Sequence, residues 1–105
     1  MGASVLLVDD ERFARTVYSD YLRGAGYEVE VAEDVDAALG ALRARRFDVL
    51  LTDVILPDAD GLELLAQAKP LDPAMEALVI TALDRVDTAV RAMKTGASDS
   101  LVKPV

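Results

Sequence analysis

Residues 5–10 read Val-Leu-Leu-Val-Asp-Asp, a short apolar run that stops at two adjacent aspartates. Residues 48–53 read Asp-Val-Leu-Leu-Thr-Asp, so a second apolar run also ends on an aspartate. Continuous apolar runs of this length are typical of parallel strands that are buried on both faces. If both runs belong to one parallel sheet, Asp9, Asp10 and Asp53 meet at its carboxyl edge, where ligands bind in open α/β sheets.

Two later stretches end in a similar way, since Ala77 to Ile80 leads into Thr81, and Leu101 to Val102 leads into Lys103. Helical patterns lie between the runs, and this alternation predicts a parallel sheet with helices on both faces. The expected strands are 5–8, 28–32, 48–52, 77–80 and 101–102. The first expected helix follows Asp10 and ends near Gly24 or Gly26, and the second begins after a capping Asp34. The third covers 62–68, and the fourth runs from Asp84 to Gly96.

Three of these elements carry specific expectations. The segment 28–32 alternates charged and apolar residues, which indicates an outer strand with one wet face. Pro70 and Pro73 are expected to stop the third helix, because proline cannot continue the helical hydrogen bonding. Four apolar side chains after Asp10 share one face by their spacing, which indicates a helix: Phe13, Val17, Tyr21 and Leu22.

Composition narrows the class of protein. The 105 residues are enough for one domain with a real core, and 52% of them are hydrophobic. No apolar run approaches the roughly 18 residues of a membrane span, and we expect no signal peptide. The chain has no cysteine and no histidine, which leaves only a hard, oxygen-bound metal such as Mg²⁺. The net charge of −8 argues against this domain binding nucleic acid by itself.

The aspartates give the chemistry. Neighbouring carboxylates repel one another unless a cation lies between them, and a third carboxylate makes the cluster costly without one. Any one of these aspartates alone is better explained as a helix cap or a strand end. For Asp9, Asp10 and Asp53 together at one edge, a Mg²⁺ site is the better explanation.

The order of these motifs resembles that of the response-regulator receiver domains of two-component signalling. The matching segments span nearly the whole chain: Leu6–Glu11, Leu51–Gly61, Ile80–Ala82, Gly96–Asp99 and Leu101–Pro104. The resemblance implies a flavodoxin-like, doubly wound five-stranded parallel sheet in the order 2-1-3-4-5. It also implies one receiver (phospho-acceptor) domain over residues 1–105, apparently lacking the family's fifth helix, so we expect the chain to be truncated before that helix.

The resemblance further implies a role for each site residue. Asp53 is the phospho-acceptor, and Lys103 and Thr81 assist it. The metal ligands implied for Mg²⁺ are Asp10, Asp53, the backbone carbonyl of Ile55, and Asp9 through water. Such a domain is not a separate enzyme, although it catalyses its own phosphorylation and dephosphorylation. Phosphorylation is expected to shift the face made by Thr81, the fourth helix and the fifth strand, and so to control a partner or an output domain.

One departure concerns Ser100, which stands where receivers usually carry a tyrosine or phenylalanine that turns inward with Thr81. With a serine there, aromatic burial cannot be the signal. Two alternatives stay open: a degenerate receiver that serves as a protein-binding scaffold, and a Mg²⁺-dependent phosphatase with Asp53 as nucleophile. Phosphatases of the haloacid-dehalogenase type want a second aspartate two residues on, where this chain has Ile55.

The resemblance also implies partners and a location. We expect a histidine kinase or phosphotransfer protein as phosphoryl donor, self-association into a homodimer, a cytoplasmic location and no membrane partner. A DNA-binding output domain in a longer regulator, and hence transcription regulation, is expected by analogy only.

Overall fold

The structure is a computed structural model that describes residues 2–53, 56, 61–81, 91, 94, 97 and 99–102, with Thr81 and residues 99–102 described by their backbone alone. Its strands form one parallel sheet in the order β2-β1-β3-β4-β5. The elements are β1 (Ser4–Val8), α1 (Arg12–Gly24), β2 (Glu28–Ala32), α2 (Val35–Ala44), β3 (Val49–Asp53), α3 (Gly61–Leu71), β4 (Glu76–Thr81) and β5 (Asp99–Val102). The predicted five-stranded, doubly wound fold is therefore confirmed.

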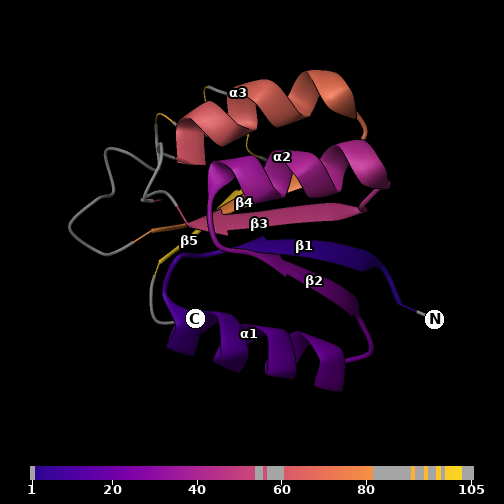
Figure 1. Cartoon of the computed structure of the whole chain (residues 1–105), viewed down its shortest axis with the longest axis vertical. Helices are drawn as coiled ribbons and strands as arrows, with labels where there is room; N and C mark the ends of the chain where they lie inside the picture. Colours follow the sequence, from indigo (N-terminus) through magenta and orange to yellow (C-terminus); the bar gives the residue numbers. More distant parts are fainter. Residues whose placement is uncertain are drawn as a thin grey trace.

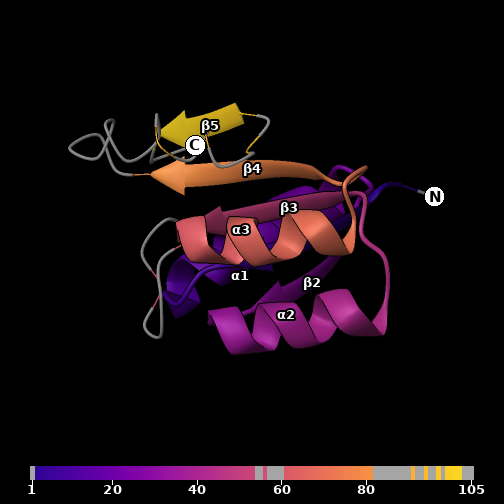
Figure 2. The ribbon, with the colours of Figure 1, turned by 90° about the horizontal axis from the view of Figure 1, so that it is seen from above.

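Helices cover both faces of this sheet. Figure 1 shows α1 on one face and α2 with α3 on the other, and Figure 2 shows the strands spread between these two layers. Successive side chains of a strand point to opposite faces, so β1 contributes to both cores. Leu6 and Val8 belong to the cluster under α2 and α3, whereas Val5 and Leu7 belong to the cluster under α1. The uninterrupted apolar sequence of β1 thus follows from its burial on two sides.

The outer strand was predicted correctly. β2 pairs only with β1 among the described strands, and Glu28 and Glu30 are exposed on it. The predicted cap of α2 is also confirmed, because the Asp34 carboxylate accepts a hydrogen bond from the Ala37 N–H at 2.8 Å. The helix expected from Asp84 to Gly96 lies mostly outside the described residues.

The predicted helix after Asp10 is present as α1, but three of the four apolar residues on its predicted face are exposed. Phe13 is 74% exposed, Val17 44% and Tyr21 76%, whereas Tyr18 and Leu22 pack against the core beneath the sheet. Both sets have the same four-residue spacing and occupy adjacent stripes of one helix, so periodicity alone could not choose between them. The small buried Ala14 lies on the inward stripe, where it lets the helix approach the sheet closely.

The third helix continues further than expected. α3 runs from Gly61 to Leu71 and contains Pro70, so the expectation that proline stops it earlier was wrong. A proline costs one helical hydrogen bond and crowds the preceding turn, but Pro70 is the next-to-last residue. The Asp72 N–H still reaches the Ala68 carbonyl at 3.3 Å and closes the turn.

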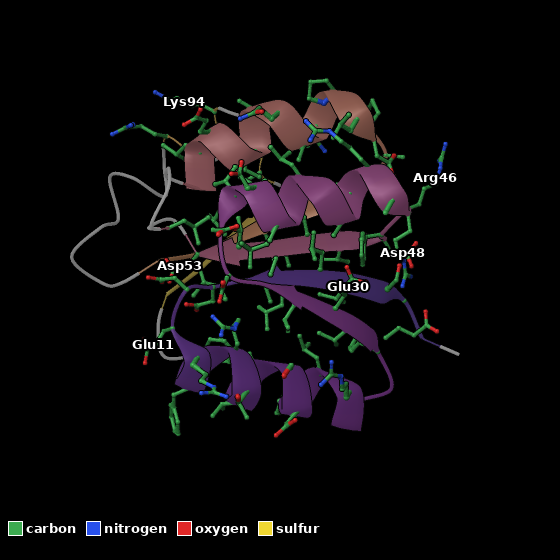
Figure 3. The ribbon with its side chains drawn as sticks, in the orientation of Figure 1. Glu11, Glu30, Arg46, Asp48, Asp53 and Lys94 are labelled. Carbon is green, nitrogen blue, oxygen red and sulfur yellow. The ribbon has the colours of Figure 1, made fainter. Side chains whose placement is uncertain are left out.

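Strand limits also differ from those expected, because β3 begins at Val49 rather than at Asp48. Asp48 instead joins the amino ends of β1 and β3. Its carboxylate accepts hydrogen bonds from the Ser4 N–H at 2.8 Å and the Ser4 hydroxyl at 3.2 Å, while its own N–H donates to the Ser4 carbonyl at 2.9 Å. Figure 3 shows Asp48 at the end of the sheet opposite to Asp53.

Replacing Asp48 is therefore expected to destabilise the fold. Asp48→Ala leaves the buried Ser4 N–H without its acceptor, which costs about 1–3 kcal/mol of unfolding free energy. Urea denaturation followed by far-UV circular dichroism measures the change. Asp20→Ala, at an exposed position of α1, is the control and is expected to unfold like the unmodified protein. Equal stability of the Asp48 variant and this control would contradict the structural role.

Candidate functional site

Three carboxylates gather at the carboxyl edge of the sheet. Each of Asp9, Asp10 and Asp53 offers one oxygen, and these oxygens all lie within 4.8 Å of one another. The cause is the pairing of β1 with β3, in which Val8 lies opposite Thr52. The next residues, Asp9 just after β1 and Asp53 at the end of β3, therefore lie at the same level of the sheet edge. The structure brings together the aspartates that the sequence analysis singled out.

The main chain around Asp9 is held on several sides. Asp9 is fully buried, its N–H donates to the Ala32 carbonyl at 3.1 Å, and its Oδ1 accepts from the Glu11 N–H at 2.9 Å. A guanidinium N–H of Arg15 donates to the Asp9 carbonyl at 2.8 Å. Because ordered backbone dipoles replace water around this residue, its carboxylate can stay at the sheet edge in a fixed place.

Asp53 and Asp10 differ from Asp9 in their access to solvent. Asp53 is 9% exposed at the last position of β3, and Figure 3 shows its side chain at the carboxyl end of the sheet. Asp10 is exposed. One buried, one nearly buried and one exposed carboxylate make a site that is shaped by the protein on one side and open on the other.

The donor set fits Mg²⁺. All three groups supply carboxylate oxygens, which hard cations prefer, and an open side leaves room for the water and phosphate oxygens that Mg²⁺ retains. The chain contains no histidine or cysteine that would favour a softer metal.

The structure describes only some of the other predicted site residues. Thr81 ends β4, one residue beyond Ile80, which pairs with Asp53, and Val102 of β5 lies opposite Thr81. The backbone of Ser100 is in β5, opposite Val79. Lys103 and Ile55 lie outside the described residues, so their predicted roles stay predictions.

Sequence reasoning missed two contacts of Asp9: the Arg15 guanidinium donates to its carbonyl, and the Glu11 main-chain N–H donates to its carboxylate. A contact to a main-chain carbonyl leaves no mark in a search for chemical motifs. One signal was available: Arg12 and Arg15 are both cations in the first turn of a helix, where a positive charge opposes the helix dipole, so their presence there calls for another explanation.

Fold and cluster together define a flavodoxin-like α/β protein with an acidic sheet edge whose carboxylates could hold a cation. Comparison with known proteins gives the family. The sequence profile of the response regulator receiver domain matches residues 5–105, and the chain belongs to this family.

Comparison with individual relatives supports this family assignment. Transcriptional regulatory protein ZraR of Escherichia coli is 44% identical over 101 residues, which is 96% of this chain and 23% of ZraR. The crystal structure of NtrX from Brucella abortus superposes with a TM-score of 0.95 at 34% identity, over 100% of this chain and 24% of that one. A response regulator from Burkholderia pseudomallei, crystallised with a phosphorylated aspartic acid, a calcium ion and citrate, gives a TM-score of 0.92 at 33% identity, over 98% of this chain and 61% of that one.

Two of these relatives are much longer than this chain. The chain spans about a quarter of the length of ZraR and of NtrX. Receiver domains belong to two-component signalling and bind Mg²⁺ at an acidic pocket, and this chain has an aspartate cluster at the corresponding edge. Within the described part of the chain, every helix is too short or too polar to cross a membrane.

Magnesium is expected to bind at the aspartate cluster and to stabilise the fold. At ten times its dissociation constant, Mg²⁺ adds about 1.4 kcal/mol to the unfolding free energy, and chelation with EDTA removes this gain. Asp10→Asn takes away one charged ligand and is expected to weaken binding at least roughly tenfold in isothermal titration calorimetry. Asp20→Asn is the matched control. Wild-type affinity in the Asp10 variant would place the cation elsewhere.

Proposed function

We propose that this chain is a phosphorylation-dependent signalling switch in which Asp53 accepts a phosphoryl group. The observation that carries the proposal is the cluster of Asp53 with Asp9 and Asp10 at an accessible sheet edge. The family supports it, and so does the Burkholderia relative, which was crystallised with a phosphorylated aspartic acid.

The reaction requires little of the protein beyond placing charge. A carboxylate oxygen of Asp53 attacks the phosphorus of a phosphohistidine on the donor protein. A new O–P bond forms, the P–N bond breaks, and the leaving imidazole takes up a proton from water. Asp53 becomes an aspartyl phosphate. Because the attacking group is anionic and the phosphoryl group is too, the main task of the site is to offset negative charge.

The residues of this chain divide that task. Asp10 and Asp53 would hold Mg²⁺ directly together with the Ile55 carbonyl, and Asp9 would act through a bound water. When bound, the ion neutralises charge on the transferred oxygens. Lys103 would offset the remaining charge, since it follows β5 directly. Thr81 would donate a hydrogen bond to a phosphoryl oxygen.

The output is a population shift. An aspartyl phosphate adds close to two charges and three acceptors beside the end of β4, and Thr81 is the last residue of that strand. A pull on Thr81 would bias the segment after β4 and the neighbouring β5 toward a second arrangement that a partner or output domain reads. Since ZraR is named a transcriptional regulatory protein, we propose transcription regulation as the output, within a longer cytoplasmic regulator.

The donor protein needs a surface to dock on. α1 begins beside the aspartate cluster, and its stripe of Phe13, Val17 and Tyr21 is exposed. Large exposed apolar side chains on one face of a helix mark protein contacts. We propose that a histidine kinase or phosphotransfer protein packs on this stripe while its phosphohistidine reaches Asp53.

The two alternatives are weaker. A phosphatase would need a group to turn over the aspartyl intermediate, and Ile55 occupies the place of the second aspartate. A degenerate scaffold has no need of three carboxylates within 4.8 Å, which repel one another and cost stability. Homodimer formation, expected where the sheet lacks the cover of a fifth helix, stays a proposal.

The phospho-acceptor role is tested with a small-molecule donor. Incubation with Mg²⁺ and acetyl phosphate is expected to add the mass of one phosphoryl group to the intact chain, as measured by mass spectrometry. Asp53→Asn is expected to abolish the adduct, whereas Asp20→Asn keeps it. An adduct that persists in the Asp53 variant overturns the assignment. Continuous release of phosphate favours the phosphatase, and no reaction at all favours the scaffold.

The docking stripe is tested by comparing two donors. Phe13→Ser is expected to slow phosphoryl transfer several-fold from whichever histidine kinase of the same genome phosphorylates the chain fastest. The rate with acetyl phosphate should stay unchanged, because that donor needs no docking surface. Tyr27→Ser removes an aromatic that is 42% exposed just before β2, and it serves as control. Equal slowing with both donors would mean that Phe13 acts on the site itself.

A further inference from the structure

Arg15 is a charged side chain that the proposed reaction does not use. It lies in the first turn of α1, and its guanidinium turns back toward the sheet edge. Nη1 donates to the Asp9 carbonyl at 2.8 Å, and Nη2 lies 3.9 Å from the carboxylate of Glu33 in the loop between β2 and α2. The Arg15 side chain is 17% exposed, whereas that of Glu33 is 66% exposed.

Helix stability does not explain this arginine. The amino end of a helix carries a partial positive charge, so a cation there is unfavourable. Arg12 is a second cation of the same turn, and the acidic residue nearest to both is Glu11 at the N-cap. What sets Arg15 apart is its pair of contacts outside the helix, with the Asp9 carbonyl and the Glu33 carboxylate.

The contact with Asp9 has a geometric consequence for Asp10. The Asp9 carbonyl and the Asp10 N–H belong to one planar peptide unit. A hydrogen bond to that carbonyl fixes the plane, and the plane sets the direction in which Asp10 leaves the chain. Asp10 is exposed, so packing does little to orient it. The hydrogen bonds of the Asp9 N–H and Oδ1 hold the residue on the other side of this peptide.

We propose that Arg15 is a positioning residue for the cation site. It holds the peptide between Asp9 and Asp10 so that the Asp10 carboxylate points toward Asp9 and Asp53 before a cation binds. This inference rests on the proposed function, because it assigns to Arg15 the preorganisation of that same site. Groups that orient metal ligands in this way typically change metal affinity by roughly 10–100-fold when they are lost.

A lysine at this position separates geometry from charge. Lys keeps the positive charge near the aspartates, but it is a single ammonium on a flexible stem, whereas the guanidinium is a planar fork that can reach the Asp9 carbonyl and Glu33 together. If Arg15 only offsets charge, Arg15→Lys behaves like the wild type. If Arg15 fixes the peptide plane, Arg15→Lys binds the cation more weakly.

The same helix provides a matched control. Arg23 is near the other end of α1 and also donates to a main-chain carbonyl, that of Val29, at 3.0 Å. Arg23→Lys makes the same chemical change in the same kind of contact, away from the aspartates. Glu33→Gln tests the second contact, and because the Glu33 side chain is exposed, its effect is expected to stay within about twofold.

The experiment measures Mg²⁺ affinity by isothermal titration calorimetry on the 105-residue chain. Arg15→Lys is expected to weaken binding by roughly tenfold, and Arg23→Lys by less than about twofold. In the metal-free protein, the ¹⁵N amide resonance of Asp10 is expected to move in Arg15→Lys and to stay in Arg23→Lys. With acetyl phosphate, the Mg²⁺ concentration for half-maximal rate rises, while the rate at saturating Mg²⁺ is kept.

Three results would overturn the proposal: wild-type affinity in Arg15→Lys, an equal loss in Arg23→Lys, or an unmoved Asp10 amide. Arg15→Gln is the second variant, and circular dichroism checks that both are folded. If only Arg15→Gln loses affinity, charge rather than position is the cause, and the proposal fails. If the wild type binds Mg²⁺ in an Arg15-dependent way but takes no phosphoryl group, the proposed function fails while the positioning role stands.

Discussion

β1 and β3 pair in parallel with Val8 opposite Thr52, so the next residues, Asp9 and Asp53, lie side by side at the edge of the sheet. This pairing concentrates three carboxylates within 4.8 Å, an arrangement that repels itself in the absence of a cation. The repulsion is tolerated because the strands behind it are anchored in two apolar cores, one under each helical layer. Burial of a leucine side chain contributes about 1.5–3 kcal/mol, and Leu6, Leu7 and Leu50 are fully buried. The free energy gained by burying these apolar side chains therefore offsets the repulsion between the carboxylates at the sheet edge.

The two ends of the sheet show opposite solutions for an acidic group. At the amino end, the Asp48 carboxylate accepts a hydrogen bond from the Ser4 N–H, and the Asp48 N–H donates to the Ser4 carbonyl. These bonds join the start of β1 to the start of β3. At the carboxyl end, Asp9 is buried, and backbone N–H groups and Arg15 hold the main chain around it. In the first arrangement one carboxylate oxygen of Asp48 accepts two hydrogen bonds from Ser4, and in the second the oxygens of three carboxylates lie close to one another. Only the second is suited to taking up a cation and a phosphoryl group.

α1 links the chemistry to the surface. Its inward stripe packs on the sheet, its first turn supplies Arg15, and its outward stripe exposes Phe13, Val17 and Tyr21. One helix thus contacts the core, the acidic site and the solvent where a donor protein would approach. The helix begins two residues after Asp10, so a protein docked on this stripe lies next to the cluster.

Much of this could be predicted from the sequence, because buried parallel strands are apolar without interruption and their polar ends mark one edge. The alternation of elements, the outer position of β2, the Asp34 cap and the group of Asp9, Asp10 and Asp53 all follow from residue type and spacing. Local patterns of this kind carry their own physical cause, since period and burial are directly related.

Only the tertiary structure decided which of two stripes of α1 faces the sheet. The stripe with Ala14 and the stripe with Phe13 have the same helical spacing, and these two residues differ only in size. It also decided that Pro70 fits the last turn of α3, where one lost hydrogen bond is cheap. The contact of Arg15 with the Asp9 carbonyl belongs to the same group. The sequence determined which residues can do the chemistry at this edge, and the packing of α1 determined how they are held, because main-chain contacts depend on where a helix lies rather than on which motif it carries.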